Sequence, residues 1–188
     1  MPRRRYIFDP PERFVAGTVG EPGDRTFFLQ AREGPRVVSI VLEKIQVSVL
    51  AERLGDLLAE LERRGVPEAS PAAAADALDD TGPLDEPLNE AFRAGSLTLG
   101  WDAGAERVLL EARAQDEDGE AIDPDDDDDE DEDGPDLLRV RLSPVAARAF
   151  VERAARVVAA GRLPCPLCGA PLDPAGHICP RRNGHFVN

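Results

Sequence analysis

The sequence predicts an α+β fold in which two βββα repeats pack as one pseudo-twofold domain, followed by a small C-terminal zinc-binding tail. Three observations support this prediction. Short motifs recur in the same order in two halves of the chain, apolar residues alternate in three stretches of each half, and every cysteine and histidine lies at or beyond residue 165. A chain of 188 residues is long enough for one packed domain of about 150 residues and an appendage.

The internal repeat rests on three pairs of short motifs. The pairs are FVAG at 14–17 with FRAG at 92–95, FFLQAR at 27–32 with VLLEAR at 108–113, and LAER at 50–53 with FVER at 150–153. Because their order is kept, we interpret residues 13–65 and 90–161 as two copies of one unit.

Each copy is expected to begin with three strands, since apolar and polar residues alternate as they do in half-buried strands. The expected strands cover 13–20, 25–32 and 36–42 in the first copy, and 92–100, 106–114 and 137–142 in the second. Gly and Asp residues at 21–24 and 102–104 fit the tight turns that a hairpin requires.

Each copy is expected to end in an amphipathic helix. One stripe of the first helix contains Leu50, Leu54, Leu57, Leu58 and Leu61, and the same offsets of the second hold Phe150, Ala154, Val157 and Val158. Ser143 and Pro144 suit the cap and the first residue of the second helix. A single repeat of about 50–60 ordered residues would be marginal alone, so we expect residues 1–161 to form one domain.

Two segments interrupt this pattern. Residues 66–89 are rich in Pro, Ala and Asp and are expected to form a linker, with a short helix in the alanine run. The acidic insert, residues 116–136, holds 15 of the 37 acidic residues and no basic one, so the other 22 acidic residues balance the 22 Lys and Arg. Such a self-repelling run is expected to be disordered. A hairpin tip tolerates it, because doubling a loop costs only about 0.6 kcal/mol.

The tail, residues 162–188, predicts a structural zinc site. Cys165 and Cys168 form a Cys-x-x-Cys turn, and His177, Cys179 and His185 follow it. Thiolates and imidazoles at such spacings are typical ligands of tetrahedral Zn²⁺. We expect Cys165, Cys168, His177 and Cys179 to hold the ion in a zinc-ribbon-like module, with His185 as the alternative fourth ligand. Sulfur-rich ligation favours a closed structural site over a catalytic one.

Other functional classes find little support. No histidine lies outside the tail, which excludes a Ser/His/Asp triad, and the chain has no Gly-rich phosphate loop or dinucleotide fingerprint. The electroneutral body offers no continuous basic stripe for nucleic acid. No segment approaches the roughly 20 apolar residues of a membrane span, and the start lacks the apolar stretch of a signal peptide. The three cysteines are odd in number and lie close together, whereas a secreted disulfide scaffold would spread an even set along the chain. This usage fits a reducing compartment, so we expect a cytoplasmic protein.

These observations predict a non-enzymatic, zinc-stabilised protein that binds another protein. The alternative is an enzyme or a small-ligand-binding protein in which Arg25, Arg32 and Arg113 contact an anion between the repeats. Arg32 and Arg113 end equivalent predicted strands, which makes a symmetric pair conceivable. A third interpretation is a zinc ribbon associated with nucleic acid.

Several segments also carry a family resemblance. They are FDPPERF at 8–14, GTVG at 17–20, RTFFLQAR at 25–32, SLTLGWD at 96–102 and the cysteine-histidine tail. Together they resemble a bacterial family catalogued as domain of unknown function 3090, over nearly the whole chain except the acidic insert and the alanine-rich linker. The resemblance implies a cytoplasmic protein of high-GC Gram-positive bacteria, and no activity. The resemblance also implies Asn-Gly-Tyr where this chain has Asn-Gly-His at 183–185, which favours His177 as the fourth ligand.

Overall fold

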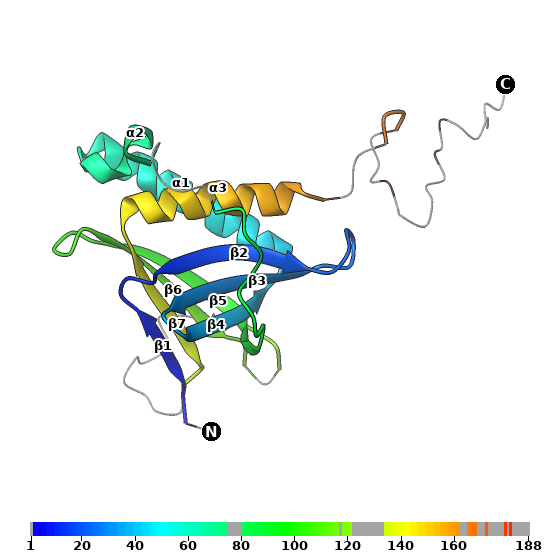
Figure 1. The fold of residues 1–188 in the computed structure, drawn as a ribbon, viewed down its shortest axis with the longest axis horizontal. Helices are drawn as coiled ribbons and strands as arrows, with labels where there is room; N and C mark the ends of the chain where they lie inside the picture. Colours follow the sequence, from blue (N-terminus) through cyan, green and yellow to red (C-terminus); the bar gives the residue numbers. More distant parts are fainter. Residues whose placement is uncertain are drawn as a thin grey trace.

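The computed structural model describes residues 2–74, 80–116, 118–121, 134–161 and 165–168, together with residues 172, 179 and 181. It has an α+β fold in which two long helices lie on one side of a seven-stranded mixed sheet (Figure 1). The predicted α+β class is therefore confirmed.

The strands are β1 (Arg5–Phe8), β2 (Arg13–Val19), β3 (Thr26–Glu33), β4 (Arg36–Leu42), β5 (Glu90–Asp102), β6 (Arg107–Ala114) and β7 (Leu137–Leu142). The helices are α1 (Lys44–Arg63), the short α2 (Pro71–Ala74) and α3 (Pro144–Ala159), and a 3₁₀ turn covers Pro67–Ala69. The six strands expected from alternation are present with ends shifted by at most two residues. The short helix expected in the alanine run corresponds to α2.

The strand order is β1-β7-β6-β5-β4-β3-β2. Neighbours within β2-β3-β4 and within β5-β6-β7 are antiparallel, whereas β4 and β5 run parallel and join the two groups. The β4–β5 pairing is short, with the partners Ser39↔Glu90 and Val41↔Arg93. Three strands and a helix thus follow one another in both halves, while the relation of the halves as copies about a twofold axis stays a prediction.

Strand β1, which the sequence analysis does not predict, pairs in parallel with β7. It has only four residues, too few for a clear alternation, and its partner lies about 130 residues away in the chain. Phe8 at its end is fully buried. The guanidinium of Arg36 in β4 donates to the Ile7 carbonyl and lies 4.4 Å from the Phe8 ring centroid. The sheet therefore curls so that β1 approaches a strand four places away in its order.

Helix α1 buries one face, made of Val47, Leu50, Ala51, Leu54, Leu58 and Leu61. It ends at Arg63, and Gly65 just beyond it has a φ of +84° that lets the Val66 N–H donate to the Leu61 carbonyl and close the last turn. Ser143 caps α3, because its hydroxyl accepts a 3.2 Å hydrogen bond from the Ala146 N–H. This confirms the predicted cap. Among the described residues, no helix combines the length and apolar character needed to cross a membrane.

The buried core draws on both halves of the chain. Helices α1 and α3 pack against each other, and α3 also packs on β2. There the rings of Phe14 and Phe150 stack with centroids 4.9 Å apart. Leu54 and Ala154, at equivalent places in the two predicted helical stripes, are both fully buried. A single apolar cluster therefore connects the first and second halves.

Part of the predicted linker packs on the sheet. Residues 80–89 run across β2 and β3 (Figure 1). The Gln30 side chain both donates to the Asp85 carbonyl and accepts from the Asp85 N–H, which fixes this segment to β3. Leu84 lies directly over Gly17, where a Cβ would come within 2.7 Å of its side chain. A glycine at position 17 is what allows this close approach.

The described ends of the acidic insert contact residues next to β6 and β1. Gln115 and Ala121 form an isolated bridge. At the other end, the Asp136 carboxylate accepts a 2.8 Å hydrogen bond from the Arg4 N–H and forms a salt bridge with the Arg4 guanidinium. The disorder expected for the insert falls mostly on residues 122–133, which lie outside the described residues.

Candidate metal centre

Three thiols of the tail lie close together. Cys165 and Cys168 are joined by a turn at residues 166–168, and Cys179 comes from further along the chain. Their sulfur atoms all lie within 4.8 Å of one another. Cys165 and Cys179 are buried, with 6% and 5% of their surface exposed, and Cys168 is half-buried.

The spacing of the sulfur atoms suits a tetrahedral metal ion. The Cys165 and Cys179 sulfurs are 3.9 Å apart, too far for a disulfide bond. Four ligands about 2.3 Å from a zinc ion would place their sulfurs about 3.8 Å apart. Three clustered thiols could therefore hold a metal ion, and a soft thiolate donor set is one that zinc prefers.

Two backbone N–H groups favour the thiolate form of Cys165. The backbone N–H groups of Leu167 and Cys168 donate to its sulfur and lower the pKa of the Cys165 thiol from 9.0 to about 6, with a smaller contribution from the neighbouring thiols. The thiolate is the form that binds metals. The lowered pKa therefore favours the metal-binding form of Cys165.

Both candidate histidine ligands, His177 and His185, lie outside the described residues. The structure therefore brings together the three predicted cysteine ligands, and the choice of the fourth ligand stays a prediction.

The arginines predicted to bind an anion have protein acceptors. Arg25 donates to the Ala160 carbonyl at the end of α3. Arg32 pairs with Glu12 at 3.0 Å and lies 3.4 Å from Asp85. Arg25 and Arg32 line two different pockets.

The third arginine, Arg113, is buried on β6. Its guanidinium lies 3.1 Å from Glu111, which also pairs with Arg139 of the neighbouring strand. Arg113 lines neither the pocket of Arg25 nor that of Arg32. The binding of an anion by these three side chains stays a prediction.

A cluster of charged residues that the sequence analysis does not single out holds segment 80–85. Arg153 is 7% exposed and donates to the Ala16 carbonyl, to the Asp80 carboxylate and carbonyl, and to the Gly82 carbonyl. Arg13 forms a fork with both oxygens of Asp80. The Arg13 hydrogen bond is the main cause that lowers the pKa of Asp80.

A sequence signal for this cluster does exist. Arg153 belongs to the recurring motif FVER and lies on the helix face between Phe150 and Ala154, which are both buried. A charged residue on a buried face needs a partner, because burying an unpaired charge is costly. The partner could not be found from the sequence, since Asp80 lies more than 70 residues away in a loop.

The comparisons with known proteins agree with the resemblance noted from the sequence. The model of one family, described as "Protein of unknown function (DUF3090)", matches residues 6–179. This range includes the whole sheet except one residue of β1, both long helices and all three cysteines. Searches of curated proteins and of solved structures found no match. The match covers most of the chain, so the protein belongs to the DUF3090 family of proteins of unknown function.

Proposed function

We propose that the chain is a non-enzymatic protein in which a structural zinc ion stabilises a C-terminal module that binds another protein. The observation that carries this proposal is the meeting of the Cys165, Cys168 and Cys179 sulfurs within 4.8 Å of one another. The zinc-ribbon-like character of the tail, the duplicated architecture of residues 1–161 and a cytoplasmic location belong to the same proposal.

A structural role follows from the ligand set. Three thiolates and one imidazole complete a tetrahedral shell and leave no position for a reactive water, which a catalytic zinc requires. We propose His177 as the fourth ligand, since it lies two residues before Cys179. A reducing compartment such as the cytoplasm would keep the three thiols available to the metal.

A metal-stabilised module of this size serves best as a binding surface. A short tail has too little apolar surface for a core of its own, so the zinc ion would supply most of its folding free energy. Partner binding should then depend on the metal. The small-ligand alternative receives no support from the arginines, because each of them already has acceptors within the protein.

The test combines metal content with partner recovery. Tagged protein is crosslinked in native cells and purified, and both zinc and co-purifying proteins are quantified for the wild type, Cys168→Ser and His185→Ala. The wild type and His185→Ala should retain zinc and recover the same partner, whereas Cys168→Ser should lose both. If Cys168→Ser lost its zinc but kept the partner, the metal would have no part in binding.

The fourth ligand is tested by a matched pair of histidine variants. His177→Ala should lose zinc to a chelator much faster than His185→Ala, because an incomplete shell holds the ion more weakly. The opposite ranking would make His185 the ligand.

A further inference from the structure

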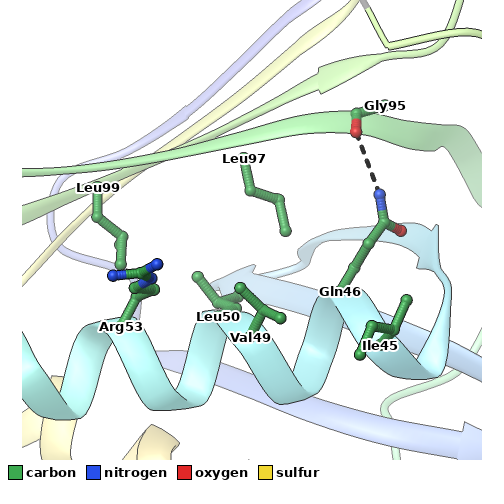
Figure 2. A pocket seen from close by; sticks show the side chains of 8 residues that line it. All are labelled: Ile45, Gln46, Val49, Leu50, Arg53, Gly95, Leu97 and Leu99. Carbon is green, nitrogen blue, oxygen red and sulfur yellow. Dashed lines mark hydrogen bonds between the residues drawn. The ribbon is translucent and has the colours of Figure 1, made fainter.

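An apolar groove of about 410 Å³ lies between helix α1 and strand β5. Figure 2 shows α1 side chains facing Leu97 and Leu99 of β5 across it. The α1 wall consists of Ile45, Gln46, Val49, Leu50 and Arg53. Ile45 is 67% exposed and Val49 is 44% exposed, although apolar side chains gain by leaving water. The groove thus presents apolar surface to solvent.

The β5 side of the groove is an open strand edge. Strand β4 pairs with β5 only as far as Arg93, while β5 continues to Asp102 with β6 on its other side. No described strand covers this edge beyond Arg93. The Gln46 side-chain amide donates to the Ala94 and Gly95 carbonyls at 3.1 Å, so these two carbonyls at the start of the edge already have a donor. The backbone further along can pair with an added strand.

Arg53 supplies a positive charge to the same groove. Its guanidinium lies beneath Leu99 in Figure 2. The side chain is exposed, and no described residue forms a hydrogen bond or an ion pair with it. An unpaired cation beside apolar side chains complements a carboxylate that is flanked by apolar residues.

The other half of the molecule shows how such a site can be occupied. Arg53 of LAER corresponds in the proposed repeat to Arg153 of FVER. Arg153 lies between α3 and the edge strand β2, where it clamps the carboxylate of Asp80. Segment 80–85 then continues across β2, with Leu84 packed on Gly17. In the proposed repeat, the Asp80 carboxylate therefore occupies the position that faces Arg53 in the groove, whereas the place of Leu84 over Gly17 corresponds to that of Gln115 and Ala121 over Gly95.

We propose that the groove between α1 and β5 binds an extended peptide segment of a partner protein that carries an acidic residue next to apolar ones. The carboxylate pairs with Arg53, the apolar side chains contact Val49, Leu97 and Leu99, and the peptide backbone pairs with the edge of β5. The groove lies between α1 and β5 rather than in the C-terminal module, so this assignment adds a second binding surface to the one in the proposed function.

The probe is a phage-displayed library of random 12-residue peptides, selected on the full-length, zinc-loaded protein. Enriched sequences should contain Asp or Glu close to apolar residues. Synthetic copies of the enriched peptides should bind the Arg53→Glu and Val49→Glu variants about tenfold more weakly. The matched control is Arg63→Glu, the same charge reversal on the same helix at a side chain that is 72% exposed and pairs with Glu60. It should bind as the wild type does. Both groove positions are solvent-exposed, so the variants should keep the wild-type melting temperature and zinc content.

Several outcomes would overturn the assignment. The absence of any enriched peptide would do so, as would equal peptide affinity for the wild type and Arg53→Glu. A dimer that Val49→Glu converts to a monomer would make a second copy of the chain the occupant. A rise in peptide affinity of about tenfold on deleting residues 122–133 would make the chain's own insert the occupant. The peptide selection uses protein that holds its metal. Failure to enrich a peptide would therefore overturn the groove assignment without contradicting zinc-dependent partner recovery. If the peptides bind the groove but the natural partner is still recovered with Cys168→Ser, the proposed function is refuted and the groove assignment stands.

Discussion

Replacing Arg153 by alanine tests whether segment 80–85 is clamped by a buried charge. The side chain is 8% exposed, and its hydrogen bonds to Ala16, Asp80 and Gly82 are 2.5 to 2.9 Å long. Its loss leaves the Ala16 carbonyl without this donor and the Asp80 carboxylate with Arg13 as its remaining arginine. Breaking a buried charged pair from one side costs about 3–5 kcal/mol. The Asp80 side chain is 34% exposed, so water compensates in part and we expect the lower end, about 3 kcal/mol.

The assay is urea unfolding followed by circular dichroism, with Arg63→Ala as the control. Arg63 pairs with Glu60 at the surface, so its removal should cost less than about 1 kcal/mol. Amide hydrogen exchange should also show loss of protection around Gly82 in Arg153→Ala but not in Arg63→Ala. A free energy of unfolding for Arg153→Ala within about 1 kcal/mol of the wild type would refute the clamp.

Three other predictions follow from the fold. The pKa of Asp80 is lowered, chiefly by the Arg13 hydrogen bond. The ionised carboxylate therefore stabilises the fold above its ordinary pKa of 3.8, and this stability is lost as the pH falls through the lowered pKa of the folded state. The free energy of unfolding in urea should change less between pH 7 and pH 3 for Asp80→Asn than for the wild type. Deleting residues 122–133 should leave the calorimetric melting temperature within a few degrees of the wild type, because a run of this acidic composition is expected to contribute few packed contacts. Leu54→Asp should remove amide protection from 13–61 and 92–158 together, since it places an unpaired charge in the shared core; protection that survived in 92–158 alone would show two independent units.

The elements that the sequence predicts well are those whose signal is local. Alternating residues located six strands, and Ser143 with Pro144 located the start of α3. Strand β1 was missed because four residues carry no periodicity and its pairing with β7 is set by the tertiary structure. A strand that depends on a distant partner cannot be recognised from its own residues.

The same distinction applies to the sites. The three cysteines were predicted because metal ligands cluster in the sequence, and the structure brings their sulfurs together. Segment 80–85 has the composition of a linker, yet Arg13 and Arg153 hold it from positions about 70 residues away on either side. The groove beside β5 lies past Arg93, the last β5 residue that pairs with β4. The charge of Arg153 on a buried helix face signals a partner without identifying it, and the groove has no local signature.

X-ray absorption at the zinc edge, combined with elemental analysis of freshly reduced protein, tests the proposed metal site. We expect one zinc ion per chain, with three sulfur ligands at about 2.3 Å and one nitrogen ligand at about 2.0–2.1 Å. Freshly reduced protein that holds no zinc, or zinc bound by fewer than three sulfurs, would contradict this prediction.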